Sequence, residues 1–146
     1  MKAETFIIVN PTAGEGQAEK RWQDFENVLR QNQIPFQAII TEYQNHSTEL
    51  VTEALSSGYN RIGVFSGDGT LNEVIQGLFS EDTFPLNDIK LIFFPAGSSC
   101  DYEKKFKNKR SWIERIQADD TLNIDVFKVE CQDFSGKQMN RYIINN

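Results

Sequence analysis

Short apolar, β-branched runs alternate with longer amphipathic segments through the first two thirds of the sequence. Four runs have the length of buried strands, and the segments between them repeat apolar residues at helical spacing. The expected strands are residues 5–9, 34–40, 61–65 and 89–94, and the expected helices are 15–31, 47–57 and a segment that carries Leu71, Val74, Ile75 and Leu78. Strands that alternate with helices form a parallel sheet covered on both faces. The sequence therefore predicts an α/β fold, a three-layer, Rossmann-like domain with a mostly parallel sheet.

Length and composition narrow the class of protein. The 146 residues and 39% apolar content suit one domain with a single core. No apolar run approaches the roughly 18 residues that span a bilayer. No signal segment precedes the first run, and Cys100 and Cys131 are too few for a disulfide framework, so we expect a cytoplasmic protein. The net charge of −6 opposes nucleic-acid binding. The single histidine and the two cysteines do not have the spacing of a transition-metal site, whereas Mg²⁺ held by phosphate and carboxylate oxygens fits the composition.

Polar or glycine-rich segments follow each of the four expected strands. They are residues 10–14, 41–46, 66–70 and 95–101. Ligands of open parallel sheets bind beyond the carboxyl ends of the strands. We therefore expect the site where these four junctions meet.

The third junction, Ser66-Gly67-Asp68-Gly69-Thr70, carries the strongest chemical signal. Its two glycines allow the backbone to approach a ligand, and a helix follows directly. Free N–H groups in a first helical turn, reinforced by the helix dipole, bind phosphate. Thr70 can cap the helix or bond a phosphate oxygen, and Asp68 can coordinate Mg²⁺ through water or orient the loop. Judged alone, the five residues fit an Asx turn without a ligand equally well.

Other polar residues near the junctions have two interpretations each. Asn10 can donate its side-chain amide to a nucleotide, or it can end the first strand before Pro11. Asn72 and Glu73 can contact phosphate or metal, although an early glutamate also suits the helix dipole. His46 fits a helix-entry residue better than a catalyst.

In order and spacing, these junctions resemble those of the catalytic domain of the diacylglycerol kinase family, which includes bacterial lipid kinases and, more distantly, sphingosine and ceramide kinases. The shorter Gly-Asp-Gly motif is shared with NAD kinases and phosphofructokinases, and the resemblance covers nearly the whole chain. The matching segments are Ile7-Ile8-Val9-Asn10-Pro11 with Gly14, Thr41-Glu42-Tyr43 with His46, and Ser66-Gly67-Asp68-Gly69-Thr70-Leu71-Asn72-Glu73-Val74.

This resemblance implies the N-terminal domain fold of NAD kinases and diacylglycerol kinases, with residues 1–146 as the nucleotide-binding domain. It implies transfer of the γ-phosphoryl group of ATP to a lipid hydroxyl such as that of diacylglycerol, with ATP and Mg²⁺ as cofactors. The implied partners are a lipid acceptor at the inner face of the membrane and a second copy in a homodimer, with no nucleic acid. The implied catalytic residue is Asp68, through metal or loop orientation, and metal ligands stay unassigned. The implied ATP contacts are Asn10, Thr41, Ser66, Gly67, Asp68, Gly69, Thr70, Leu71, Asn72, Glu73, Gly97 and Ser98.

Two other functions stay open at this point. One is a small-molecule kinase related to NAD kinases, and the other is a nucleotide-binding module without catalysis. Phosphorylation of NAD alone would favour the first, and ATP binding without transfer would favour the second.

The chain departs from the family pattern at two places. The fourth junction of the family reads Gly-Thr-Gly-Asn-Asp, whereas this chain has Gly97-Ser98-Ser99-Cys100-Asp101. Family members are about twice as long, with a second, mostly β domain after a segment resembling residues 141–145. We therefore expect a fragment of a longer protein, inactive by itself, whose general base and metal carboxylates lie in the β domain.

Residues 104–110 concentrate five positive charges in seven positions of an acidic protein. Such a segment can rest on anionic lipid or draw ATP phosphates toward a site, and it can also be a solvated surface.

Overall fold

A four-stranded parallel sheet forms the centre of the protein. The computed structural model describes residues 4–105 and 109–144. All neighbouring strands of the sheet are parallel, and Ile7 lies opposite both Ala38 and Gly63. In spatial order the strands are β2 (Phe36–Ile40), β1 (Thr5–Val9), β3 (Arg61–Ser66) and β4 (Lys90–Pro95).

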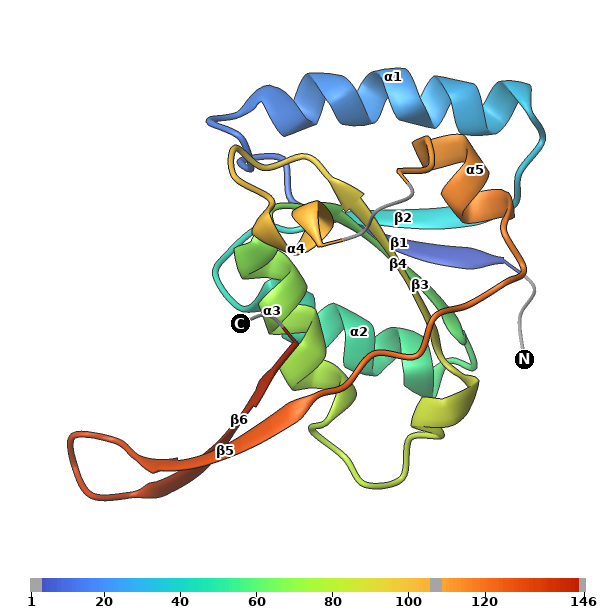
Figure 1. Cartoon of the computed structure of the whole chain (residues 1–146). Coiled ribbons are helices and arrows are strands. Elements are labelled where there is room, and N and C mark those ends of the chain that lie inside the picture. The colour runs from blue at the N-terminus through green and yellow to red at the C-terminus, as the bar shows by residue number, and fades with distance from the viewer. Residues whose placement is uncertain (1–3, 106–108, 145–146) are drawn as a thin grey trace.

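Helices cover both faces of this sheet, as Figure 1 shows. One face carries α1 (Gln17–Gln31) and α5 (Trp112–Gln117), and the other carries α2 (His46–Ser56) and α3 (Asp68–Leu78). Successive strand residues point to opposite faces, so each strand supplies both cores. The three-layer α/β prediction is confirmed.

Each face has its own apolar core. Toward α1, Trp22 and Phe25 pack with Phe65, at ring-centroid distances of 5.3 and 6.0 Å. Toward α2 and α3, Val64 packs with Ile75 and other aliphatic side chains. Because both cores draw on the same strands, β1 is buried along its whole length.

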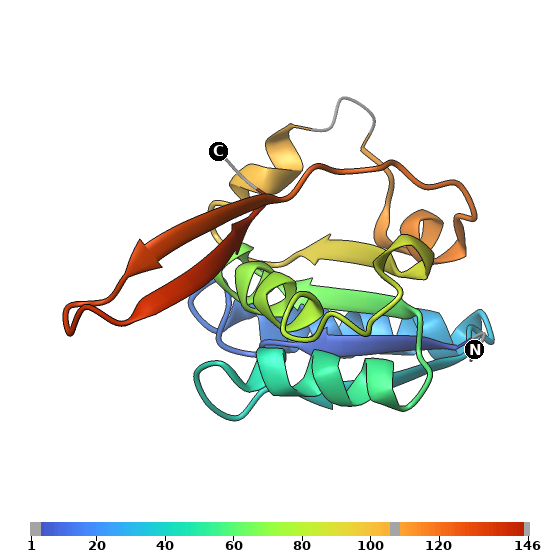
Figure 2. The ribbon, with the colours of Figure 1, turned by 90° about the horizontal axis from the view of Figure 1, so that it is seen from below.

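Smaller elements lie before and after β4. A four-residue helix α4 (Asp101–Lys104) precedes α5, and a 3-10 helix η1 (Leu86–Asp88) precedes β4. An antiparallel hairpin follows, made of β5 (Phe127–Gln132) and β6 (Gln138–Ile143). Figures 1 and 2 show this hairpin extending away from the layered body. Within the described residues, no helix is long and apolar enough to cross a bilayer.

Several element boundaries differ from the sequence prediction. The predicted loop 66–70 is wrong at its end, because α3 begins at Asp68 and the extended Gly67 is its N-cap. The amide of Leu71 donates to the carbonyl of Gly67 at 3.3 Å, which closes the first turn. Helix α1 begins two residues later than predicted, because Gly16 has a left-handed φ of 85°. Strand β2 begins only after Pro35, which cannot donate to a ladder.

Candidate functional site

The first and third junctions meet at the carboxyl end of the sheet. Asn10 Nδ2 donates to Thr70 Oγ1 at 2.8 Å, across 60 residues of sequence. Asn10 Oδ1 accepts from the amide of Thr12 at 3.1 Å, so the Asx turn of this region lies at Asn10. Of the two roles predicted for Thr70, helix capping is not formed, because its hydroxyl binds Asn10, and the bond to a phosphate oxygen stays a prediction. Strands β1 and β3 flank the point where the strand order reverses, which is where such sheets bind ligands.

Glycine backbones bring the fourth junction against the other two. A Cβ atom at Gly97 would lie 2.6 Å from the Cα of Gly67, which is a clash with backbone. A Cβ at Gly14, whose φ is +58°, would lie 2.7 Å from the carbonyl oxygen of Ala96. Only glycine fits these positions, because any side chain would push the junctions apart.

Asp68 joins the third junction to the fourth. Its Oδ2 accepts a hydrogen bond of 2.6 Å from the backbone amide of Asp101. Its Oδ1 is buried and has no hydrogen-bond partner among the described residues. A buried, unpaired carboxylate oxygen is costly, so it indicates a site where a cation or a hydroxyl donor binds. No group of three or more His, Cys, Asp or Glu residues in the described parts of the chain is arranged to hold a metal alone.

The first turn of α3 has the properties of an anion site. The N–H groups of Asp68, Gly69 and Thr70 are in the first turn and have no intrahelical acceptor, and the helix dipole adds positive potential there. A Cβ at Gly69 would meet nothing within 4 Å, so the backbone is open on that side. This turn can therefore bind a phosphate group closely.

A pocket of about 430 Å³ opens beside this turn. Asp68 and Asn72 contribute polar atoms to its lining, whereas the rest of the lining is largely apolar. The lining residues are Asp68, Gly69, Leu71, Asn72, Tyr102, Ile143 and Ile144. Tyr102, Ile143 and Ile144 were not among the predicted site residues. Tyr102 directly follows a predicted junction, but no sequence signal indicated that the end of β6 returns to α3.

The second junction is tied to α3 through Glu73. Glu73 Oε1 accepts from the amide of Asn45 at 3.3 Å, and its carbonyl accepts from Thr48 Oγ1 at 3.0 Å. His46 is the first residue of α2, and its Nδ1 accepts from the amide of Glu42 at 3.1 Å. These contacts are structural, which agrees with the helix-entry interpretation of His46.

Tyr43 stacks on His46 with a centroid distance of 4.2 Å, beside the second junction. Its hydroxyl donates to Glu49 Oε2 at 2.6 Å, and this hydrogen bond raises the pKa of Tyr43. The phenol therefore stays neutral at physiological pH.

The altered fourth junction has a strained backbone at Cys100, whose φ is +44°. Its Sγ donates to the carbonyl of Gly97 at 3.4 Å, and burial raises the pKa of the thiol. Cys100 is therefore a neutral thiol that closes a turn. Ser98 and Ser99 are exposed on the same turn.

The predicted site residues differ in their surroundings in the structure. The hydrogen bonds and glycine contacts above bring together Asn10, Gly67, Asp68, Thr70 and Gly97. The side chain of Leu71 is only 2% exposed and packs in the core, and Ser66 is also buried, with its hydroxyl donating to the carbonyl of Gly67 at 2.9 Å. Thr41 is half-buried and Ser98 is exposed.

The predicted basic segment lies partly outside the described residues, which exclude 106–108. At its two ends, Lys104 pairs with Asp101 at 2.6 Å and Arg110 pairs with Asp120 at 2.8 Å. Both pairs are exposed, and such pairs contribute little to stability. The charges of these two residues are therefore partly balanced within the chain.

Comparisons with known proteins agree with this geometry. The family model of the diacylglycerol kinase catalytic domain matches residues 4–129. Diacylglycerol kinase of Staphylococcus haemolyticus (strain JCSC1435) is 30% identical over 142 residues, which cover 95% of this chain and 39% of that protein. Sphingosine kinase 1 of Mus musculus is 36% identical over 117 residues, which cover 80% of this chain and 31% of that protein.

Solved structures give the same result. A crystal structure of a diacylglycerol kinase from Bacillus anthracis str. Sterne superposes with a TM-score of 0.57 and 26% sequence identity, covering 69% of this chain and 33% of that one. The chain thus spans less than half the length of these relatives. The match of the family model to most of the sequence, together with the parallel sheet and its converging junctions, shows that the chain belongs to the diacylglycerol kinase catalytic domain family.

Proposed function

We propose that this domain binds ATP for transfer of its γ-phosphoryl group to a lipid hydroxyl. The observation that carries the proposal is the first turn of α3, where the open backbone at Gly69 adjoins the buried, unpaired Oδ1 of Asp68. The free N–H groups of that turn would hold phosphate oxygens. Phosphoryl transfer depends mainly on positioning and on neutralising charge, and this chain supplies the positioning.

Mg²⁺ fits the chemistry of Asp68, because carboxylate oxygens are the ligands it prefers. Asp68 Oδ1 would face the ion directly or through water, while Oδ2 stays on the amide of Asp101. When bound, Mg²⁺ neutralises part of the phosphate charge. The other ligands would come from ATP and from carboxylates outside this chain.

The pocket beside α3 supports an apolar acceptor. Ile143 and Ile144 line it next to Asp68, so an acyl chain or glycerol backbone could lie against them with its hydroxyl toward the phosphate site. The relatives named above act on diacylglycerol or sphingosine according to their names, and diacylglycerol or a similar lipid is the acceptor that we propose here.

Several expectations stay predictions. The second, mostly β domain, the homodimer and the peripheral contact with the inner face of a membrane are compatible with the structure but are not tested by it. The exposed apolar residues of the hairpin, Phe127 and Val129 among them, are compatible with further polypeptide packing there.

ATP binding by the chain tests the nucleotide part of the proposal. We expect Gly69→Ala to reduce ATP affinity by on the order of tenfold or more, because the new methyl group occupies the open face of the turn. Stability should stay the same or rise by up to about 1 kcal/mol, since alanine favours a helix over glycine. Isothermal titration with Mg²⁺-ATP and thermal unfolding measure the two effects.

Gly58→Ala is the matched control. Gly58 has a φ of +88° with open space around it, and it lies before β3, at the opposite end of the sheet from the site. We expect this variant to lose about 1 kcal/mol of stability and to keep its ATP affinity. Equal ATP affinity for Gly69→Ala and the wild type would contradict the proposed phosphate site.

The acceptor is tested with the full-length protein. Labelled ATP is offered with diacylglycerol, sphingosine or NAD, and we expect label in a lipid. Label in NAD alone would favour the small-molecule kinase, and ATP binding without transfer to any acceptor would favour the non-catalytic module.

A further inference from the structure

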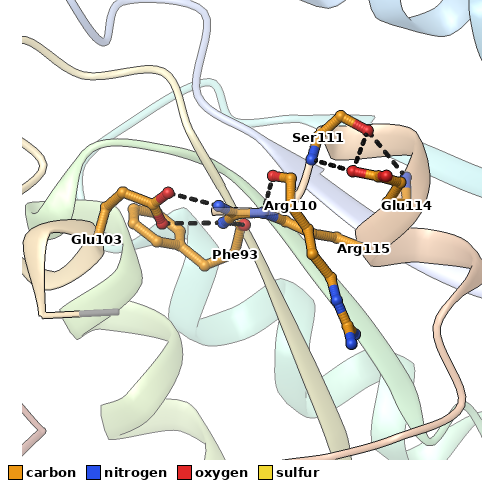
Figure 3. Close-up of polar contacts among 6 residues, drawn as sticks. All are labelled: Phe93, Glu103, Arg110, Ser111, Glu114 and Arg115. Carbon is orange, nitrogen blue, oxygen red and sulfur yellow. Dashed lines mark hydrogen bonds and ion pairs between the residues drawn. The ribbon is translucent and has the colours of Figure 1, made fainter. Parts of the chain in front are cut away.

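Arg115 connects four parts of the chain behind the fourth junction (Figure 3). Its Nη1 donates to the carbonyl of Phe93 at 2.8 Å and to Glu103 Oε2 at 2.9 Å, and its Nη2 donates to Glu103 Oε1. Its Nε donates to the carbonyl of Arg110 at 3.0 Å. The guanidinium of this α5 residue thus binds β4, α4 and the segment before α5.

The Arg115–Glu103 ion pair is shielded from water. The side chains are only 17% and 13% exposed, whereas the Arg30–Glu26 pair on α1 is 65% and 30% exposed. A shielded, two-pronged arginine–carboxylate pair fixes both position and orientation. Removal of one partner leaves the other charge without compensation, so the geometry depends on both.

Helix α4 needs such external contacts. Its four residues are far fewer than a stable isolated helix requires. Tyr102 anchors it to one core, with its ring 6.1 Å from that of Phe93, and Glu103 anchors it to Arg115. One face of the short helix is therefore held by packing and another by the ion pair.

The position of α4 determines the surroundings of Asp68. The first residue of α4 is Asp101, and its amide donates to Asp68 Oδ2 at 2.6 Å. Glu103 follows two residues later on the same turn. A shift of α4 would therefore move the amide away and release the carboxylate of Asp68.

We propose that Arg115 is a positioning residue of the phosphate site: it binds Glu103, holds α4 in place and so keeps the Asp101 amide on Asp68. Its importance for ATP rests on the function proposed above, but its effect on Asp68 does not. The hydrogen bonds of the Arg115 guanidinium go to Phe93, Glu103 and Arg110, so in this proposal it acts on Asp68 through α4.

Three variants of the whole chain test this role. Arg115→Met removes the charge and keeps much of the volume, Arg115→Lys keeps the charge without the planar fork, and Glu103→Gln removes the charge of the partner. Arg30→Met is the matched control, since it removes an arginine from an exposed Arg–Glu pair at the far end of α1.

Two measurements are made on each variant. The first is the amide proton of Asp101 by NMR, because an amide bonded to a carboxylate resonates downfield and exchanges slowly. The second is the affinity for Mg²⁺-ATP. A variant counts as folded when the NMR signals of its other amides stay near their native positions. If Arg115→Met does not fold, Glu103→Gln takes its place in both measurements.

We expect Arg115→Met and Glu103→Gln to lose the downfield Asp101 signal and to bind ATP on the order of tenfold more weakly, as the loss of a charge-assisted hydrogen bond implies. Arg115→Lys should be intermediate and Arg30→Met unchanged. A native Asp101 signal in both folded Arg115→Met and Glu103→Gln would overturn the proposal. Loss of the Asp101 signal with unchanged ATP affinity would overturn the claim that Arg115 supports the phosphate site.

Failure of the proposed function would look different. If the wild type does not bind ATP, the ATP proposal fails, while the Asp101 signal still decides whether Arg115 positions Asp68.

Discussion

The central sheet and the C-terminal hairpin are both built from five- or six-residue strands, but they are stabilised in different ways. In the sheet, Phe65 is completely buried between α1 and its neighbours. In the hairpin, Phe127 is 53% exposed, and Phe134 at the turn lies in solvent. Figure 2 shows the same contrast, with the sheet between helices and the hairpin outside them.

This difference in burial indicates that the sheet contributes most of the stability of the chain. The sheet buries apolar side chains on both faces, and burial is the dominant favourable term in folding. The hairpin has its own ladder, from the Phe127–Ile143 pair to the Gln132–Gln138 pair, and is anchored at β6. There Tyr142 stacks on Phe79 at 4.4 Å, and Gln76 bonds both the amide and the carbonyl of Tyr142. An isolated two-stranded hairpin is only marginally stable, so this anchor is important.

The largest expected effect compares one phenylalanine from each region. We expect Phe65→Ala to lower the free energy of unfolding by about 3 to 5 kcal/mol, because it leaves a cavity in a closed core. Phe127→Ala should change it by only about 0.5 kcal/mol, because its side chain is already half in water. Urea unfolding followed by fluorescence measures both, and similar losses would show that the hairpin is part of the same core.

The second effect concerns the contact between α2 and α3. A Cβ at Gly77 would lie 2.3 Å from Val51 Cγ1 and 2.8 Å from the carbonyl oxygen of Thr48. We therefore expect Gly77→Ala to destabilise the body by about 1 to 3 kcal/mol through overpacking. Gly69→Ala on the same helix is the control, since it meets open space. Thermal unfolding that ranks Gly69→Ala as the more damaging change would contradict this packing.

The third effect should be confined to the hairpin. Gln76→Ala removes two hydrogen bonds of 2.7 and 3.1 Å to the backbone of Tyr142. Their net contribution is about 1 kcal/mol each, so amides of β6 should exchange roughly thirtyfold faster while those of β3 stay protected. Gln138→Ala, on the exposed part of β6, should leave exchange unchanged. Faster exchange in β3 would mean that the two regions open together.

The smallest effect is a pH dependence of the hairpin turn. The carboxylate of Asp133 accepts from the hydroxyl and amide of Ser135 and from the amide of Lys137, and these hydrogen bonds lower the pKa of Asp133. A lowered pKa in the folded state contributes stability above the ordinary value of about 4, and that stability is lost as pH falls through the lowered value. We expect the turn amides to exchange relatively faster below about pH 4 than those of β3. Asp133→Asn should remove this dependence.

Much of the body could be predicted from the sequence because its pattern is local. Continuous apolar runs mark β1 and β3, and helical spacing marks α1 and α3. Helix α4 could not be predicted, because four residues show no periodicity. The hairpin does have a local signal, because residues 127–132 alternate apolar and polar side chains and Ser135-Gly136 is a turn signal. Of this hairpin, we identified only residues 141–145, which include the end of β6, from the sequence.

The site was predictable in its location but not in its contacts. The four junctions lie where parallel strands end, which follows from topology. The Asn10–Thr70 bond, the Asp68–Asp101 bond and the Arg115–Glu103 pair join residues distant in sequence, and no local pattern indicates them. The local sequence allows Thr70 to cap the helix or to bond a phosphate oxygen, and it does not indicate that Asn10 is its partner.

The Gly67–Gly97 contact also explains which positions of the fourth junction can tolerate substitution. Position 97 touches backbone, and position 101 must supply a peptide N–H, so glycine is required at the first and proline is forbidden at the second. Ser98 and Ser99 between them are exposed, whereas the side chain of Cys100 closes the turn and packs against the core. The chain departs from the Gly-Thr-Gly-Asn-Asp pattern at these three middle positions only. Substitutions at positions 98 and 99 should therefore leave the loop intact, whereas a side chain at position 97 or a proline at position 101 should displace it.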